Sequence, residues 1–160
     1  WRDNRPNMMN EGTHGINAMD SLGRKVLMEE GRGLQLLAQR IAQTVERARG
    51  QPALTAHAEA LAKALQRLVA ATQAAWASGQ PALALANAVP YMQAFGHTVL
   101  AWTWLDVALA VLVSPESPAR SGRLAAMRYF FHYELPKIGA WLNVVEACDL
   151  TCASLPEDAF

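Results

Sequence analysis

The stretch LTAHAEALAKALQRLVAATQAA, residues 54–75, decides the fold class of this chain. Its apolar and small positions recur alternately four and three residues apart: Leu54, Ala58, Leu61, Leu65, Leu68, Thr72 and Ala75. That spacing puts them on one face of an α-helix, and it is typical of helices that pack nearly antiparallel in a bundle. We therefore predict a long helix here, which follows Gln51-Pro52 and ends before a turn at Gly79-Gln80-Pro81.

The segments on either side show the same helical spacing. Before this helix, the positions that predict another helix, ending at Gly50, are Leu34, Leu37, Ile41 and Val45. After it, residues 82–113 are interrupted by Pro90, which removes a backbone donor and would kink a continuous helix. We expect an all-α fold, an up-and-down bundle of about four long helices, some of them kinked at proline or glycine, preceded by a loop and one further helix.

The last helix of the predicted bundle follows a loop rich in serine and proline at residues 114–118. Apolar residues at helical spacing then predict a helix from about Ala119 onward with a bend at Pro136: Leu124, Met127, Phe131, Leu135, Ile138, Leu142 and Val145. Aromatic residues that the fold left exposed, from the Trp102 and Trp104 segment or among Tyr129, Phe130 and Tyr133, would indicate an interface.

Residues 98–113 form the most apolar run in the chain, so a membrane span is an alternative to a bundle helix. A span needs about 20 consecutive apolar residues, whereas this run is shorter and contains Asp106. We expect a helix buried at the centre of the bundle and no membrane span.

The composition excludes several classes of function. A chain of 160 residues with a formal net charge of +0 offers no basic surface for DNA or RNA. Cys148 and Cys152 are too few for a disulfide framework and fit no zinc-binding spacing, so we expect reduced thiols. The N-terminus shows no basic and apolar leader, and we expect a cytoplasmic protein.

A carboxylate stands before a predicted helix near the N-terminus. Gly12 lets the chain turn sharply and present Glu11 from a loop, while Thr13 or His14 begins the helix. Its helical pattern comprises Ile16, Met19, Val26 and Leu27, with Gly23 allowing close packing and Asp20 four residues before Arg24. Gly31 and Gly33 predict a kink or break after it. Taken alone, a glutamate at this place is a partner for the helix dipole.

Longer runs around this carboxylate resemble the acyl-CoA dehydrogenase family, in which Glu-Gly-Thr carries the catalytic base. The matching run here is EGTHGIN, residues 11–17. Residues 20–26 and 128–136 are similar to a longer bacterial branch, the one similar to 3-methylmercaptopropionyl-CoA dehydrogenase, which carries an added helical C-terminal domain. The resemblance implies that residues 1–30 end the catalytic domain, with the base loop and the following helix, and that residues 31–160 form the appended four-helix domain.

The resemblance also implies an activity and a set of site residues. The parent protein would be an FAD-dependent acyl-CoA dehydrogenase that forms the trans-2-enoyl-CoA, with Glu11 as the base that removes the α-proton. Gly12 would let the substrate approach its backbone amide, and the residues standing where the family contacts the flavin are Thr13, His14, Gly15 and Asn17. Two positions depart from the family: Asn17 replaces a glutamine, and Asn10 replaces a tyrosine or histidine.

Partners follow from the same resemblance: an acyl-CoA substrate, electron-transfer flavoprotein or a similar acceptor, and further copies of the parent protein. The flavin and the coenzyme A need walls from other domains of the family, so we expect these 160 residues alone neither to retain FAD nor to turn over substrate. A helical interaction or oligomerisation module without a catalytic role is the alternative function.

A metal site is the remaining possibility in this segment, because Glu11 and His14 have the Glu-x-x-His spacing of di-iron bundles. Those bundles need a second such motif, and no other glutamate has a histidine three residues on. We therefore expect no metal. We expect His57, His97 and His132 to be surface residues or hydrogen-bonded core residues rather than ligands.

Overall fold

A computed structural model describes residues 13–156 of the chain, and it is all-α across that range, without a strand. The helices are α1 (Thr13–Asp20), α2 (Met28–Arg49), α3 (Thr55–Trp76), α4 (Pro81–Leu85), α5 (Ala88–Leu112), α6 (Pro118–Tyr129) and α7 (Ile138–Glu146). Short π-helical segments at Ser21–Lys25 and Phe130–Glu134 and a 3₁₀ turn at Leu135–Lys137 complete the order. The predicted fold class is confirmed.

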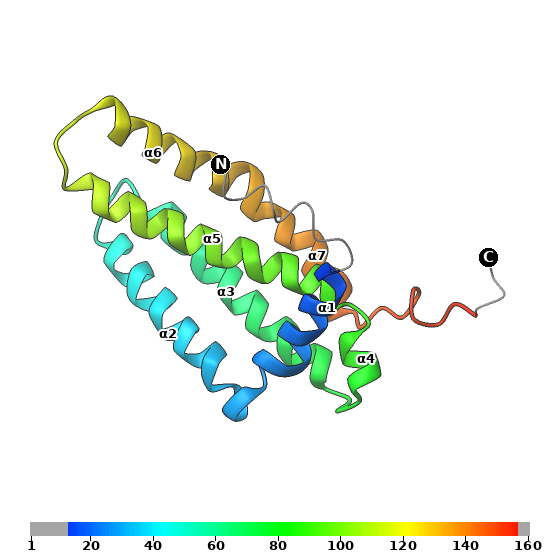
Figure 1. Ribbon diagram of the computed structural model, residues 1–160. Helices are drawn as coiled ribbons and strands as arrows, with labels where there is room; N and C mark the ends of the chain where they lie inside the picture. Colours follow the sequence, from blue (N-terminus) through cyan, green and yellow to red (C-terminus); the bar gives the residue numbers. More distant parts are fainter. Residues whose placement is uncertain (1–12, 157–160) are drawn as a thin grey trace.

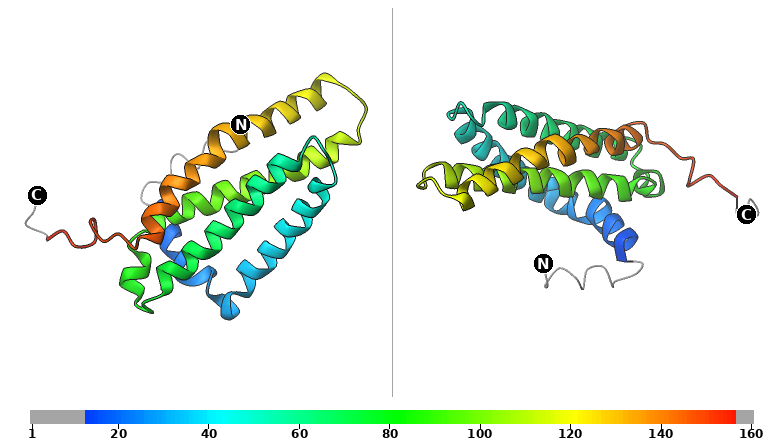
Figure 2. Two further views of the ribbon diagram at one scale, coloured as in Figure 1. Left: turned by 180° about the vertical axis from the view of Figure 1, so that it is seen from behind. Right: turned by 90° about the horizontal axis from the view of Figure 1, so that it is seen from above.

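Four long rods run alternately up and down: α2, α3, α5 and the joined α6 and α7 (Figures 1 and 2). Helix α3 packs against α2, α5 and α7, whereas α6 packs mainly against α5. The short helices α1 and α4 lie at the end of the bundle where α5 begins. Residues 147–156 extend away from that same end.

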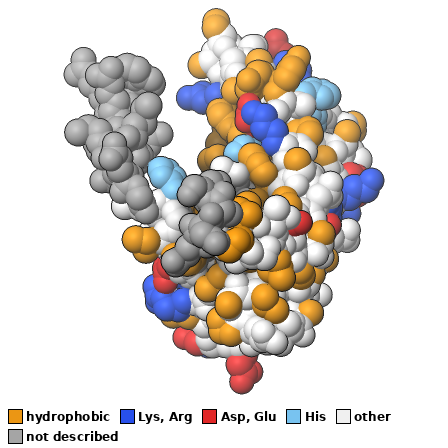
Figure 3. All heavy atoms as spheres, turned by 90° about the vertical axis from the view of Figure 1, so that its right-hand side faces the viewer, with side chains coloured by type: hydrophobic (Ala, Val, Ile, Leu, Met, Phe, Trp, Pro, Cys, Tyr) orange, Lys and Arg blue, Asp and Glu red, His pale blue; other side chains and the backbone are white. Residues whose placement is uncertain are grey.

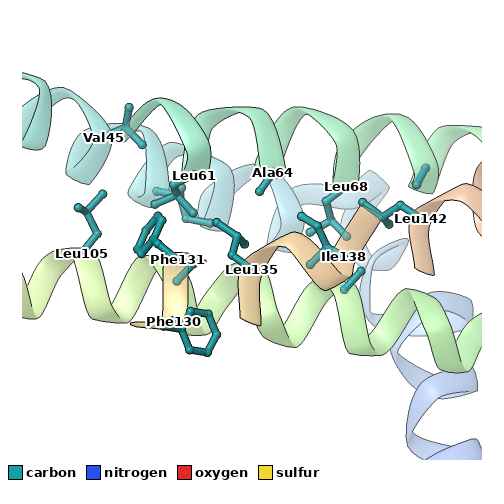
Figure 4. Packing of buried hydrophobic residues seen from close by; sticks show 14 of the residues in the cluster. Val45, Leu61, Ala64, Leu68, Leu105, Phe130, Phe131, Leu135, Ile138 and Leu142 are labelled. Atoms are coloured by element: carbon teal, nitrogen blue, oxygen red, sulfur yellow. The ribbon is translucent and has the colours of Figure 1, made fainter. Parts of the chain in front are cut away.

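The apolar face predicted for α3 forms the middle of the core. Leu61, Ala64 and Leu68 point from α3 toward apolar side chains of the last rod (Figure 4). Of the predicted positions only Leu65 is half-buried, and Ala64 and Ala71 are buried in addition. The buried face is thus wider than the predicted one, as expected for a helix with neighbours on three sides.

Helix α5 contacts α1, α2, α3, α6 and α7, which confirms its place at the centre of the bundle. It is also the one helix in residues 13–156 with the length and apolarity of a membrane span. Its buried residues recur at helical spacing and many are small, so neighbouring helices approach closely: Ala88, Tyr91, Ala94, Thr98, Ala101, Leu105, Ala108 and Val111.

The expected kink at Pro90 is wrong. The chain breaks earlier, at Ala86 and Asn87 between α4 and α5, and Pro90 is the third residue of α5. The amides of a first helical turn have no intrahelical acceptor, so a proline there loses no hydrogen bond. Packing of α4 fixes the earlier break, because Leu85 lies against Gly23, where an added Cβ would come within 3.1 Å of it.

The break predicted near Gly31 is confirmed, since Glu29, Glu30 and Gly31 have φ values of 49, 56 and 82° inside the span assigned to α2. Before the break, the apolar pattern is confirmed at Val26, which is buried, and wrong at Ile16, Met19 and Leu27, which are exposed. Ala18 and Leu22 are buried in addition. Helix α1 packs against α5, and a small residue such as Ala18 allows such helices to approach closely.

The last rod bends where Pro136 predicts it, but it is built from four pieces rather than one helix. It starts sharply because Ser117 Oγ accepts a hydrogen bond from the Arg120 amide at 3.2 Å and Pro118 occupies the first helical position. The π-helical turn that follows inserts an extra residue, and both Phe130 and Phe131 are buried there.

Replacing Trp76 with phenylalanine should loosen residues 13–27 from the bundle. Trp76 Nε1 donates a hydrogen bond to the Leu22 carbonyl at 3.1 Å, and Leu22 is fully buried. A buried acceptor without its donor costs about 1–3 kcal/mol. We expect trypsin to cut faster after Arg24 and Lys25, measured as the rate of limited proteolysis under native conditions.

Trp102 supplies a matched control for this prediction. Its Nε1 donates to Thr44 Oγ1 at 2.8 Å, a contact between α5 and α2 that includes no residue of 13–27. Trp102→Phe should lower the overall stability by a similar amount without accelerating cleavage in residues 13–27. Equal acceleration in both variants would show that Trp76 does not anchor this segment locally.

Candidate functional site

The candidate base Glu11 and the candidate substrate contact Gly12 lie outside the described residues, so the roles assigned to both stay predictions. The structure does show the helix that follows them. Helix α1 is described from Thr13 to Asp20, and one face of it packs on α5 at the end of the bundle.

The four candidate cofactor contacts lie together in the first five residues of α1. Thr13, His14 and Asn17 are exposed, and Gly15 is half-buried. No atom lies within 4 Å of the place where a Cβ of Gly15 would stand. The dipole of α1 places partial positive charge toward this N-terminal end. The segment can therefore offer polar side chains and partial positive charge to a ligand held partly by other protein.

Apolar side chains flank this polar turn without cover. Ile16 is 65% exposed and Met19 47% exposed, although both follow the predicted helical pattern. Figure 3 shows hydrophobic side chains spread over the end of the bundle that carries α1. Uncovered apolar residues next to polar ones are typical of a surface that meets another protein surface.

An ion pair at the end of α1 stiffens this segment. Arg24 Nη2 donates to Asp20 Oδ2 at 3.0 Å, and the Lys25 ammonium lies 3.4 Å from the same oxygen. The hydrogen bond from Arg24 lowers the pKa of Asp20 below its ordinary value. The predicted pair of Asp20 and Arg24 is confirmed as an exposed pair, and such pairs contribute about 0.2–1 kcal/mol.

Two of the three remaining histidines have the expected structural roles. His97 is half-buried between Phe130 and Trp141, and its Nδ1 lies 3.0 Å from the Gln93 carbonyl. Its Nε2 lies 3.5 Å from Glu134 Oε2. His132 is exposed. Across residues 13–156, no group of three or more His, Cys, Asp or Glu side chains could hold a metal ion.

His57 differs, because its buried Nδ1 has no hydrogen-bond partner. Its ring meets the edge of Phe131 with centroids 5.1 Å apart. Burial lowers the pKa of His57, and the positive charges of His132 and Arg128 lower it further. The folded protein thus binds a proton at His57 less tightly than the unfolded chain does.

This pKa shift gives the protein a pH-dependent stability with a defined sign. Because the folded-state pKa of His57 lies below the ordinary value of about 6.5, its contribution is complete above that pH and is lost as the pH falls toward the folded-state pKa. We expect urea midpoints that decrease below about pH 6.5, and an NMR titration of the His57 ring with a midpoint below 6.5. In His57→Gln the decrease should be smaller, and an unchanged decrease would contradict the assignment.

Two polar contacts inside the bundle were not predicted. The buried Tyr91 hydroxyl lies 2.7 Å from Thr72 Oγ1, which itself donates to the Leu68 carbonyl at 2.8 Å, so Tyr91 is the donor of the pair. Burial raises the pKa of Tyr91 to about 12. Arg67 bonds Glu146 through Nε and Nη2, at 3.1 and 2.9 Å. The only feature of the sequence that could have indicated the contact between Tyr91 and Thr72 is the presence of Thr72 among apolar positions of α3.

The free thiols agree with prediction. Cys148 and Cys152 are both unpaired and exposed. Cys148 has a φ of 50° after α7, and its Sγ contacts the Ala74 carbonyl at 3.4 Å.

Comparison with known proteins decides the family. Residues 37–156 match the family model described as "Acetyl-CoA dehydrogenase C-terminal like". The match begins inside α2 and runs past α7, so it covers the bundle. The chain belongs to this family.

A curated relative agrees with this membership. The 3-methylmercaptopropionyl-CoA dehydrogenase of Ruegeria pomeroyi is 34% identical to this chain over 125 residues. The aligned part is 76% of this chain and 21% of the relative, so the chain spans about a fifth of that protein. The resemblance read from the sequence is thereby confirmed: the bundle is the C-terminal helical domain of the acyl-CoA dehydrogenase family.

Proposed function

We propose that this chain is the C-terminal part of an FAD-dependent enzyme that dehydrogenates an acyl-CoA between its α and β carbons. The observation that carries the proposal is the place of the Glu-Gly-Thr motif. It stands directly before α1, in a chain whose bundle matches the family over residues 37–156. Electron-transfer flavoprotein or a similar acceptor, a homo-oligomeric parent and a cytoplasmic location belong to the same proposal.

Glu11 is the proposed base, because it alone carries a carboxylate at the family's motif position. It accepts the proton from the carbon α to the thioester, and this carbon is acidified by the adjacent carbonyl. A carboxylate with an ordinary pKa of about 4.3 is a weak base, and an apolar site that excludes water would raise that value. Gly12 leaves the backbone amide accessible to the substrate.

The first turn of α1 fits a role in holding the flavin. Thr13, His14 and Asn17 present exposed polar side chains, and the space beside Gly15 is open. The partial positive charge at this end of the helix suits an anionic or electron-rich group. When bound, FAD would accept the hydride that leaves the β carbon. These residues would orient it, while the walls of its site come from outside this chain.

The proposed domain boundary coincides with a backbone feature. Residues 1–30 would end the catalytic domain and residues 31–160 would form the appended domain, and Glu29–Gly31 is where the helix breaks. The two parts are nevertheless packed together, since α1 contacts α5 and Trp76 bonds Leu22. The appended domain would therefore act as a support that positions the base loop.

The full-length protein tests the proposal directly. It should purify with bound flavin, and an acyl-CoA added without oxygen should bleach the flavin absorbance. The isolated chain of 160 residues should be colourless, because it lacks the other walls of the site. A full-length protein without flavin would exclude the proposed dehydrogenase activity. Flavin held tightly by the isolated chain would contradict the expectation that other domains supply most of the flavin site.

An interaction module is the second candidate, and the exposed tyrosines of the last rod favour it. Tyr129 and Tyr133 are 56% and 65% exposed, and their rings stack with centroids 4.9 Å apart. Phe130, by contrast, is buried, so only two of the three predicted aromatics at this place face outward. Size-exclusion chromatography of the full-length protein with Tyr129→Ser and Tyr133→Ser tests this candidate. An unchanged oligomeric state would exclude these tyrosines as the interface of an interaction module.

A further inference from the structure

A groove of about 300 Å³ lies on the surface between α3 and the last rod, and no residue of α1 lines it. Ala60 and Ala64 of α3 form one side, and the facing wall comes from Phe131, Leu135 and Ile138. Figure 4 shows Ala64 opposite the side chains of this wall. The small alanines leave room that larger side chains would fill, so the floor is apolar and open.

Two cations stand at the rim of this groove, and only one of them is engaged. Arg67 is held by Glu146, and its Nη2 also bonds Asn143 Oδ1 at 2.6 Å. Lys63 is exposed, and no hydrogen bond or ion pair joins it to another residue in 13–156. Glu59, one turn earlier on α3, bonds Arg49 of α2 at 2.8 Å, and it is also near enough for the Lys63 charge to lower its pKa.

Further positive charge gathers at the Phe131 end of the groove. His57 lies against Phe131, and Arg128 and His132 are near enough to disfavour its protonation. The acid that follows on this rod, Glu134, is bonded to Lys137 at 2.6 Å. The groove therefore combines an apolar floor with cationic side chains at its rim.

We propose that this groove binds an amphipathic monocarboxylate, a fatty acid whose alkyl chain lies on the apolar floor and whose carboxylate meets Lys63. A volume of about 300 Å³ is at the lower end of ligand sites and suits one alkyl chain, whereas a peptide helix needs a groove several turns long. One lysine without a hydrogen-bonded partner suits one carboxylate, whereas the phosphates of a nucleotide would need several cations.

Sodium decanoate is a suitable probe, and ¹⁵N NMR of the 160-residue chain reports where it binds. We expect saturable shifts at the amides of Lys63, Phe131 and Gly139, with a Kd below about 1 mM. Decyltrimethylammonium has the same tail with the opposite charge, and acetate has the head without the tail. Neither should shift these amides at equal concentration, and equal shifts from either would overturn the proposal.

Variants separate the head contact from the tail contact. Lys63→Gln should weaken decanoate about fivefold, since an exposed charge pair contributes up to about 1 kcal/mol. Ala60→Leu should abolish binding by filling the groove. Arg40→Gln, which removes an exposed cation on α2 outside the groove, should leave the Kd unchanged. An unchanged Kd for decanoate in both groove variants would overturn the proposal. A concentration-dependent dimer that Ala60→Leu abolishes would also overturn it, because the groove would then bind a second copy of the chain.

The proposal does not depend on the dehydrogenase function. Among the described residues, none of the candidate cofactor contacts in α1 lines the groove, and the readout is binding to the chain itself rather than flavin reduction. If the decanoate-binding experiment fails, the flavin experiment can still be interpreted, and the reverse is also true.

Discussion

Replacing Glu11 with glutamine in the full-length protein should slow flavin reduction by acyl-CoA by a factor of about 10²–10⁴, the range typical for loss of a general base. The glutamine side chain has nearly the same shape but cannot accept the α-proton. Substrate binding should change little, because the amide still fills the place of the carboxylate. Anaerobic stopped-flow measurement of flavin absorbance separates the two, since the rate falls while its half-saturation concentration stays similar.

Glu116→Gln is the matched control for this experiment. Glu116 is an exposed acid in the loop before α6, and it has no part in the proposed site. Its substitution should leave the rate of flavin reduction unchanged. Full activity of the Glu11 variant would assign the base to another residue and leave the interaction module as the better reading of residues 11–17.

Leu68→Ala should lower the free energy of unfolding by about 3 kcal/mol, within the range for leucine truncation in a core. Leu68 is fully buried on α3, and it faces Ile138 and Leu142 of the last rod (Figure 4). Neighbours on several helices cannot all close on the vacated space, so a cavity remains. For a chain of this size the melting temperature should decrease by about 6–12 °C, measured by circular dichroism.

Leu100→Ala makes the same chemical change where the side chain is 48% exposed. We expect a change within about 0.5 kcal/mol, because little area returns to water and alanine favours helix. Similar losses in both variants would mean that the contact of α3 with the last rod does not form the main core.

Features with a local cause were predictable from the sequence. The four-and-three spacing on α3, the loop of prolines and serines before α6, the bend at Pro136 and the break near Gly31 all rest on backbone chemistry of nearby residues. The Glu-Gly-Thr motif was readable for the same reason. It suggested the acyl-CoA dehydrogenase family, and the match over residues 37–156 then confirmed the family.

Features that depend on a neighbouring helix were not predictable. Pro90 predicted a kink within one helix. In the structure α5 begins at Ala88, after α4 has packed Leu85 against Gly23, so Pro90 lies in the first turn. Ile16 was predicted to face the core, but in the packing of α1 against α5 Ala18 is buried and Ile16 is exposed. The donor to the Leu22 carbonyl comes from Trp76, 54 residues away, and nothing in either local sequence announces it.

By itself the sequence determined that this chain is helical, where its rods are, and that Glu11 is the candidate base, because periodicity, proline, glycine and a short motif act over a few residues. Only the tertiary structure decided which apolar residues are buried, where α5 begins, and that the segment after Glu11 is tied to the bundle through Trp76. It also brought Lys63 beside a groove whose other wall lies some seventy residues further along the chain. Burial and side-chain hydrogen bonds need both partners in place, and packing alone brings them together.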